Sequence, residues 1–400
     1  MKKRVAVGLS GGPPLFRSAE LQKGKDGLRV AMGLSGGVDS AVSAAILKEQ
    51  GYEVTGVFLI CYRGPECRTD EDRKDALDVA LKLGIPFKVL DFRKEYQEKV
   101  LEYFKAEYTA GRTPNPDVVC NREIKFGLFY KWARKREFDF IATGHYAQIF
   151  CDKRQDTSYM LKIPKDKHKD QTYFLYQLRE EQLGHILFPI GGMTKVQVRN
   201  EAKRRGLSVA DKPDSQGICF IGEVSVPKFL KQMGIIEKEG EVMILDPIGT
   251  HKGVWFYTIG QRVPKLQATS YKLQVKYNEN LRKVGFDLAK MPPLYVMEKD
   301  VAKNRLVVGG RDECMKKEFT VGDVHWVNQS PVTGHQSPVF VRIRHQGELI
   351  PAKIQIPRLA GRRVKSKITV CLSEPVFGVA PGQSCVFYNG EVCLGGGVID

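Results

Sequence analysis

Residues 33–40 read Gly-Leu-Ser-Gly-Gly-Val-Asp-Ser, and their types and spacing are typical of a loop that grips a pyrophosphate. Two adjacent glycines let backbone N–H groups approach phosphate oxygens, and Ser35 and Ser40 add hydroxyl donors. The alternative is a plain glycine-rich turn between a strand and a helix. The candidate nucleotide contacts are Gly33, Leu34, Ser35, Gly36, Gly37, Val38, Asp39 and Ser40.

Asp39 is the acidic residue of this loop, and its carboxylate has two candidate roles. Cleavage of a triphosphate requires a hard cation with oxygen ligands, so Asp39 would organise Mg²⁺ or the loop itself. The same side chain would also suit the cap of the helix that follows. The two roles are compatible, and the sequence leaves both open.

Two further polar loops each carry a cysteine. In residues 111–121, Gly-Arg-Thr-Pro-Asn-Pro-Asp-Val-Val-Cys-Asn, two prolines stiffen a loop that would present Asn115, Asp117 and Cys120 at the start of a helix. The positive end of that helix would raise the thiolate fraction of the cysteine. The second loop, Lys-Pro-Asp-Ser-Gln-Gly-Ile-Cys-Phe, contains Cys219. The two thiols indicate either a redox pair or a sulfur relay, and a small buried hydrophobic residue is the alternative for each.

Strands and helices alternate from Leu28 to about Ala147, which predicts an α/β domain with a doubly wound parallel sheet. Ligands bind such sheets at the carboxyl ends of the strands, which is where the 33–40 loop falls. The expected strands are Leu28–Leu34, Val54–Ile60, Phe87–Phe92 and Phe138–Thr143, and the expected helices are Ser40–Gln50, Asp70–Leu83, Lys94–Tyr108, Arg122–Lys135 and Thr194–Arg205.

After about Gly222, short β-rich runs punctuated by Gly and Pro predict small antiparallel barrels or sandwiches. These runs are Val242–Leu245, Gly253–Ile259, Leu294–Met297, Arg305–Gly309, Val339–His345, Lys367–Leu372 and Cys385–Tyr388. We therefore expect a catalytic domain at residues 1–225, a central β-rich domain at 226–300 and a C-terminal β-barrel at 301–400.

The start of the chain contains a repeat. Arg4–Gly12 recurs almost identically as Arg29–Gly37. The first copy runs into Pro13-Pro14, which removes N–H donors that a phosphate would need. We therefore assign function to the second copy and regard residues 1–27 as a partial duplicate of the first strand.

The 400 residues include 63 Lys and Arg against 46 Asp and Glu, and the net charge of +17 suits a large polyanion bound over several domains. No apolar run approaches the ~20 residues of a membrane span, so no membrane partner is expected. Nine scattered cysteines favour a reducing compartment, namely the cytoplasm, with the mitochondrial matrix as the alternative. Cys61 and Cys67 lack metal-ligand spacing, so no protein metal site is predicted.

Seven blocks of sequence resemble those of the tRNA-specific 2-thiouridylases, a family of PP-loop ATP pyrophosphatases, in the same order from about residue 29 to 400. The blocks are Ser-Gly-Gly-Val-Asp-Ser (35–40), Asn-Pro-Asp-Val-Val-Cys-Asn (115–121), Ala-Thr-Gly-His-Tyr-Ala (142–147), Lys-Asp-Gln-Thr-Tyr-Phe-Leu (169–175), Asp-Ser-Gln-Gly-Ile-Cys-Phe-Ile (214–221), Tyr-Thr-Ile-Gly-Gln-Arg (257–262) and Pro-Gly-Gln with Leu-Gly-Gly-Gly (381–397). The chain departs from the family pattern at residues 263–291, which are longer and Lys-rich, and at its duplicated start.

The resemblance implies that ATP, with Mg²⁺, adenylates the 2-oxygen of the wobble uridine in tRNA before sulfur is transferred. It implies that Cys219 carries a persulfide received from a sulfur donor protein such as a cysteine desulfurase or a sulfur relay protein. Cys120 would either help to release sulfide or attack the outer sulfur and leave a Cys120–Cys219 disulfide, and Asp117 would be the general acid or base.

The resemblance also implies binding residues. ATP contacts are expected at Gly144 and near Leu59. Contacts with the target base are expected at Asn115, Pro116 and Asp117, and contacts with tRNA at His145, Lys169, Asp170, Gln171, Arg344, His345 and Gln383.

Two rival functions differ in what they require. Another ATP pyrophosphatase that acts on a small carboxylate would need neither Cys120 nor Cys219. A catalytically inactive RNA-binding protein would follow if the altered N-terminus had destroyed the loop. Pyrophosphate release that depends on unmodified tRNA supports only the 2-thiouridylase.

Overall fold

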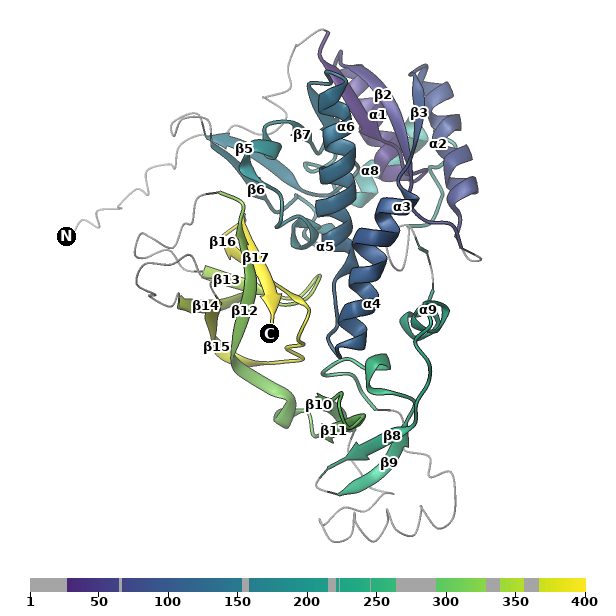
Figure 1. The fold of residues 1–400 in the computed structure, drawn as a ribbon. Coiled ribbons are helices and arrows are strands. Elements are labelled where there is room, and N and C mark those ends of the chain that lie inside the picture. Colours follow the sequence, from purple (N-terminus) through teal and green to yellow (C-terminus); the bar gives the residue numbers. More distant parts are fainter. Residues whose placement is uncertain are drawn as a thin grey trace, which may run out of the picture.

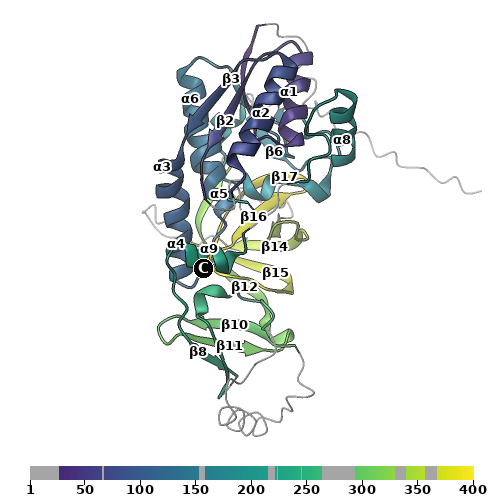
Figure 2. The ribbon, with the colours of Figure 1, turned by 90° about the vertical axis from the view of Figure 1, so that its right-hand side faces the viewer.

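The computed structural model describes residues 27–400 apart from 65–66, 153–157, 215–220, 223, 245, 264–292, 329–338 and 356–366. Cys219, the first repeat copy and nearly all of the Lys-rich run therefore lie outside the described residues. The described elements form three parts, with a helix-covered sheet at the top of Figure 1, a β-barrel in the middle and a small sheet at the bottom, and Figure 2 shows the same order from the side. Within these residues no helix is long and apolar enough to cross a membrane.

A five-stranded parallel sheet forms the first part, which confirms the predicted doubly wound fold. Its order is β3-β2-β1-β4-β7, and every neighbouring pair is parallel. The chain changes direction across the sheet between β1 and β4, and ligands bind such sheets at this switch point. The strands are β1 (Arg29–Gly33), β2 (Glu53–Ile60), β3 (Phe87–Asp91), β4 (Phe140–Ala142) and β7 (Ile186–Leu187).

Helices cover both faces of this sheet because successive strand residues point to opposite sides. Val30 and Met32 of β1 pack in one core with α1, α2 and α8, whereas Ala31 packs on the opposite face with the helices between Arg93 and Lys135. The helices are α1 (Val38–Glu49), α2 (Thr69–Leu83), α3 (Arg93–Tyr96), α4 (Glu102–Thr109), α5 (Pro116–Cys120), α6 (Tyr130–Lys135) and α8 (Lys195–Arg204), and π-helical segments η1 (Gln97–Leu101) and η2 (Asn121–Phe129) join α3 to α4 and α5 to α6.

The helix predicted to begin at Arg122 begins instead at Pro116. Proline is favourable in the first turn, where its missing N–H would have no partner inside the helix. Cys120 is therefore the last residue of the 5-residue α5, which continues as a helix to Lys135. The expectation of a thiol at a helix start was wrong, and the field of a helix N-terminus falls off within the first turn.

A closed six-stranded barrel forms the middle part, as predicted for the C-terminal region. Its strands run in the order β12-β15-β14-β13-β16-β17, and pairing of β12 with β17 closes it. The hairpin β5–β6 extends this sheet, with Cys393 of β17 opposite Leu161 of β6. The strands are β5 (Gln148–Asp152), β6 (Ser158–Lys162), β12 (Met315–Trp326), β13 (Val339–Arg342), β14 (Ile350–Gln355), β15 (Ile368–Phe377), β16 (Ser384–Asn389) and β17 (Val392–Ile399).

The third part is a four-stranded sheet in the order β10-β11-β8-β9, in which β11 and β8 are parallel. The prediction of a strand at Gly253–Ile259 was wrong, because Val254–Phe256 form a 3-10 helix. The backbone N–H groups of Gly253 and Val254 donate to the side-chain atoms His251 Nδ1 and Asn304 Oδ1, and not to the backbone of another strand. The elements here are α9 (Val226–Gln232), β8 (Gly240–Met243), β9 (Pro247–His251), the 3-10 helix η5 (Val254–Phe256), β10 (Tyr295–Asp300) and β11 (Arg305–Gly309), and the connecting elements elsewhere are η3 (Lys167–Lys169), η4 (Thr172–Phe174), α7 (Glu180–Leu183) and η6 (Asp312–Cys314).

A buried ion pair fastens the segment after β6 to the barrel. Arg342 of β13 donates to Asp170 Oδ2 at 2.5 Å, and the two side chains are 9% and 2% exposed. The other carboxylate oxygen accepts from the N–H and the hydroxyl of Thr172 at 2.9 and 2.7 Å. The guanidinium lies over the ring of Tyr388, 5.2 Å from its centroid. Each charge thus depends on its partner, because an isolated buried charge is strongly unfavourable.

We expect Asp170→Asn to lower the free energy of unfolding by about 3–5 kcal/mol, because Arg342 would remain as a buried charge without a carboxylate. Urea unfolding measures the difference. The control is Lys353→Ala on the exposed side of β14, which should change stability by less than about 0.5 kcal/mol. Equal effects of the two substitutions would contradict this role of the ion pair.

Candidate active site

The glycine-rich loop lies at the switch point of the parallel sheet, directly between β1 and α1. Leu34 still bonds to β2, with its N–H 2.9 Å from Val57 O, so the chain leaves the sheet at Ser35. A helix has no internal partners for its first four N–H groups, and its N-terminus carries partial positive charge. The residue before α1 is Gly37, so this end of the helix suits an anion.

Close packing shapes the loop. Gly36 has a φ of +75°, and a Cβ there would overlap a backbone carbonyl in the first turn of α2. A Cβ on Gly144 would lie 2.6 Å from the backbone nitrogen of Ser40, so the carboxyl end of β4 closes on the loop. Ser40 Oγ accepts from the N–H of Ser35 at 3.2 Å and donates to Gly37 O at 3.0 Å. The structure thus brings the predicted ATP contacts of the loop and Gly144 together.

Asp39 lies in the first turn of α1, and the cap position belongs to Gly37, which excludes the capping alternative. Lys195 Nζ donates to both carboxylate oxygens of Asp39 at 2.8 Å, and the Tyr146 hydroxyl donates to Oδ1 at 2.9 Å. Burial, reinforced by the charge of Asp39, raises the pKa of Tyr146, so this hydroxyl remains a donor. The Lys195 side chain is only 13% exposed. Asp39 is thus a charged group held in a fixed orientation.

Asp214 extends this cluster by accepting from three cations. Oδ1 lies 2.8 Å from Lys195 and 2.7 Å from Arg199, and Oδ2 lies 2.7 Å from Lys169. Burial alone would raise the pKa of Asp214, but hydrogen bonds from Lys169 and Lys195 outweigh it and lower the pKa to about 2. Asp166 also belongs to this cluster, because its carboxylate accepts from the backbone N–H of Lys195 at 2.9 Å. With Asp39 the cluster holds three carboxylates and three cations, so its charges balance beside the loop.

Lys212 ties the loop to α2. Its Nζ donates to Gly36 O at 2.9 Å and to Asp72 Oδ1 at 2.7 Å, and it also pairs with Asp75. One ammonium therefore fixes a loop carbonyl and neutralises part of the acidic face of α2. This reduces the repulsion that the two carboxylates would exert on a phosphate in the loop.

The second constellation forms the start of α5. Asn115 is the cap residue, and Pro116 and Asp117 occupy the first turn. Cys120 is 0% exposed. Asn115, Pro116, Asp117 and Cys120 thus lie together at one short helix and its cap. Cys219 lies outside the described residues, so its place relative to this helix is not described.

Two of the predicted tRNA contacts are buried. His145 is 8% exposed, and its ring lies 5.7 Å from that of Phe126 and 6.0 Å from that of Phe188. Burial lowers the pKa of His145, which keeps the ring neutral. Asp170 is held by Arg342 as described above. Neither side chain has an open surface for a phosphate in this conformation, so both assignments stay predictions.

The other predicted tRNA contacts lie nearer the surface, and Arg344 is exposed. Lys169 pairs with Asp214, and Gln171 accepts from the backbone N–H of Tyr146 at 2.8 Å. The His345 ring lies 4.4 Å from that of Phe174, and the Gln383 amide donates to two backbone carbonyls. Of this group, Arg344 is the side chain best placed to meet a polyanion.

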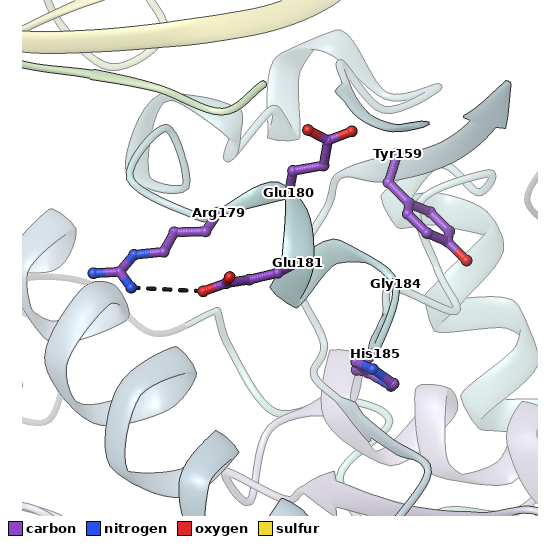
Figure 3. Close-up of a pocket in the computed structure, with 6 residues that line it drawn as sticks. All are labelled: Tyr159, Arg179, Glu180, Glu181, Gly184 and His185. Atoms are coloured by element: carbon purple, nitrogen blue, oxygen red, sulfur yellow. Dashed lines mark ion pairs between the residues drawn. The ribbon is translucent and has the colours of Figure 1, made fainter. Parts of the chain in front are cut away.

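A separate pocket of about 630 Å³ opens elsewhere on the first part (Figure 3). His185 in its lining directly precedes β7, so the pocket lies at the amino edge of the sheet, opposite the glycine loop. Arg179 and Glu181 form an ion pair at its wall, at 3.6 Å (Figure 3). The lining residues are Tyr159, Arg179, Glu180, Glu181, Gly184 and His185, and none of them is a predicted site residue.

Besides Asp166, five polar side chains of this site were not predicted from the sequence, and one of them, Arg199, lies on the same helix as Lys195. Tyr146, Lys212 and Asp214 lie inside sequence motifs described above. A polar side chain in such a motif was the one sign that each could belong to the site. Lys195 lies outside every motif. Its contact with Asp39 joins residues 156 positions apart, and one sequence carries no sign of such a contact.

Three family models match segments of all three parts of the chain. Residues 28–223 match the family described as the tRNA methyl transferase HUP domain, residues 227–280 the tRNA methyl transferase PRC-barrel domain, and residues 316–399 the aminomethyltransferase beta-barrel domain. The tRNA-specific 2-thiouridylase MnmA of Shewanella putrefaciens is 42% identical over 94% of this chain and 96% of that protein. The protein of the same name from Pediococcus pentosaceus is 41% identical over 93% and 95%.

Among solved structures, the U34-tRNA thiolase NcsA from Methanococcus maripaludis is 17% identical over 54% of this chain and 68% of that one, with a TM-score of 0.35. A likeness at this level carries no further argument.

The lowered pKa of Asp214 predicts a pH-dependent contribution to stability. A carboxylate whose pKa falls on folding stabilises the protein above its ordinary pKa of 3.8, and this is lost as the pH falls toward about 2. Asp214→Asn should lower the free energy of unfolding at pH 7 by about 1 kcal/mol, a small value because the ion pairs are partly exposed.

The difference between Asp214→Asn and the wild type should shrink as the pH falls below 3.8 in a series of urea unfolding experiments. Asp211→Asn, at a carboxylate that is 84% exposed, is the control and should have little effect at any pH. A difference that grows on acidification would refute the assignment.

Proposed function

The chain belongs to the tRNA-specific 2-thiouridylase family, and we propose that it converts the wobble uridine of tRNA into 2-thiouridine in an ATP-dependent reaction. The observation that carries the proposal is the position of the Gly33–Ser40 loop at the switch point of a parallel sheet, beside a cluster whose carboxylates are paired with cations. Such a loop supports phosphate binding, and the Cys120 loop supports sulfur transfer. The products are 2-thiouridine, AMP and pyrophosphate.

The first step activates the uridine. Its 2-oxygen attacks the α-phosphorus of ATP, the bond between that phosphorus and the bridging oxygen breaks, and pyrophosphate leaves. The loop N–H groups with the hydroxyls of Ser35 and Ser40 hold the leaving group, and the backbones of Gly144 and Leu59 contact the nucleotide. Donors fixed in advance stabilise the charge that develops there.

Asp39 is the residue that would hold Mg²⁺, which supplies charge neutralisation at the phosphates when bound. One carboxylate together with phosphate oxygens is a usual ligand set for this ion. Within the described part of the chain, no group of three or more His, Cys, Asp and Glu side chains could hold a metal. Lys195 already occupies both oxygens of Asp39, so the ammonium must share them or turn toward a phosphate.

The second step transfers sulfur from a persulfide on Cys219, loaded by a sulfur donor protein. The outer sulfur attacks C2 of the uridine, and AMP leaves with the original oxygen. The Cys120 thiolate attacks the inner sulfur, Cys219 Sγ, and not the outer sulfur that the sequence comparison implied, because attack on the outer sulfur would expel the Cys219 thiolate and form no Cys120–Cys219 disulfide. Attack on the inner sulfur breaks the S–S bond, leaves the outer sulfur on C2 and forms the Cys120–Cys219 disulfide. In the other route, Cys120 first releases sulfide, which then attacks C2. In both routes the two thiols supply two electrons, and an external thiol restores them.

Asn115, Pro116 and Asp117 face the target base in this scheme. Asp117 acts as a general acid or base, and its place in the first turn of α5 keeps it close to Cys120 in the helix. A base in an anticodon loop is already single-stranded, so its extrusion into such a site costs less than it would from a duplex.

The net charge of +17 supports tRNA as the substrate, because phosphate contacts give much of the affinity of a nucleic-acid-binding protein. The rival small-molecule ATP pyrophosphatase leaves Cys120 and the two β-rich parts without a role. The inactive RNA-binding protein is disfavoured because the intact copy of the repeat forms β1.

Wobble uridine in tRNA incubated with this protein, ATP, Mg²⁺ and a persulfide donor should gain sulfur, as mass spectrometry would show. Cys219→Ser should abolish the product, and Cys120→Ser should block turnover yet still load a persulfide on Cys219. Cys371→Ser, in β15, is the control and should keep activity. Normal 2-thiouridine formation by Cys219→Ser would rule out Cys219 as the carrier of the persulfide.

Asp39→Ala should reduce tRNA-dependent pyrophosphate release by about 100-fold or more, because the loop loses its one carboxylate for a cation. Asp78→Ala, exposed on α2, is the matched control and should retain the wild-type rate. Deletion of residues 1–27 should also leave the rate largely intact, since β1 begins at Arg29. Loss of activity in a folded deletion variant would assign a role to the first repeat copy.

A further inference from the structure

The backbone just before Asn115 lies where all three parts of the molecule meet. From the barrel, Gln383 Nε2 donates to Thr113 O at 2.9 Å and to Pro114 O at 3.3 Å. Pro381 O, in the same barrel loop, accepts from the Thr113 N–H at 2.8 Å. From the third part, Thr258 accepts from the Thr113 hydroxyl at 3.2 Å. The barrel loop and the third part, both distant in sequence, thus hold Thr113 and Pro114 in place.

These contacts are packed as well as hydrogen-bonded. Thr113 and Pro114 are both buried, and Thr113 is 8% exposed. A Cβ on Gly382 would lie 2.8 Å from the Thr113 nitrogen, so the barrel loop approaches as closely as glycine allows. Buried carbonyls that lose their donors remain unsatisfied, which makes this arrangement strongly preferred.

The geometry of Gln383 is at odds with a phosphate contact. A side-chain amide has two N–H donors on one nitrogen, and here that nitrogen faces two carbonyl oxygens. The remaining polar atom, Oε1, is an acceptor, and so is every phosphate oxygen. Gln383 in this conformation therefore has no donor left for the tRNA backbone.

We propose that Gln383 is a positioning residue for the sulfur-transfer site, which it holds through the Thr113–Pro114 backbone. This inference rests on the proposed roles of Asp117 and Cys120. Only the cap residue Asn115 separates this backbone from Pro116, the first residue of α5, so the orientation of Thr113–Pro114 sets where the first turn of the helix starts. Small displacements of a reacting group reduce rates steeply, whereas binding of a large substrate through other contacts is unaffected.

The experiment compares Gln383→Ala with Gln355→Ala, a control on β14 of the same barrel. Thr258→Val removes the contact from the third part and serves as a second test variant. Each full-length protein is assayed for tRNA affinity, for single-turnover 2-thiouridine formation at saturating tRNA, and for amide hydrogen exchange in residues 111–120.

We expect Gln383→Ala to slow single-turnover thiolation at least about tenfold with tRNA affinity within about twofold of the wild type. Thr258→Val should act in the same direction but less. Exchange in residues 111–120 should be faster in both variants and unchanged in Gln355→Ala, because the Thr113 N–H is bonded to the loop that Gln383 helps to hold.

A fall in tRNA affinity with an unchanged saturated rate would overturn the proposal and make Gln383 a tRNA contact. Unchanged exchange in residues 111–120 of Gln383→Ala would overturn it as well, whatever the activity. If the wild type forms no 2-thiouridine, the proposed function fails, and the exchange measurement still decides whether Gln383 holds the loop.

Discussion

Pairing of β6 with β17 makes the parallel-sheet part and the barrel a single folded unit. The hairpin that leaves the first part becomes two outer strands of the barrel sheet, and the buried Asp170–Arg342 pair fastens the chain that follows it. A ladder of backbone hydrogen bonds and a desolvated ion pair both require one relative orientation. The barrel loop at residues 381–383 can meet the Thr113 backbone because that orientation is fixed.

Ion pairs also surround the phosphate loop and hold it in place. Asp39 and Asp214 would repel ATP if they stood alone, but Lys195 bridges them, and Lys169 and Arg199 also pair with Asp214. Low exposure of the bridging ammonium strengthens these interactions compared with the same pairs in open water. An arriving polyanion thus meets carboxylates that are already paired with cations, and Mg²⁺ at Asp39 would share that carboxylate with Lys195 or displace the ammonium toward a phosphate.

The sequence was sufficient for the parallel sheet, the barrel and the position of the phosphate loop, because apolar periodicity and glycine spacing are local signals. It misplaced the start of the helix that carries Cys120, since the two prolines were assigned to a loop and Pro116 in fact begins the helix. The sequence also gave no sign that Lys195 meets Asp39 or that Gln383 meets Thr113. These contacts are set by the packing of whole elements, and a motif describes only neighbours in the chain.

Burial of Cys120 and the three-part support of its loop together bear on the order of the proposed reaction. Water hydrolyses an adenylated base and free thiols reduce a persulfide, so a site that uses both species benefits from keeping them enclosed. Cys120 is wholly buried, and the loop before its helix is fixed by the barrel and by the third part. Exposure of this thiol therefore requires a change in contacts that two other parts of the molecule maintain. A substrate of tRNA size, bound across several parts, can bias those contacts, whereas the proposed ATP contacts all lie in the parallel-sheet part.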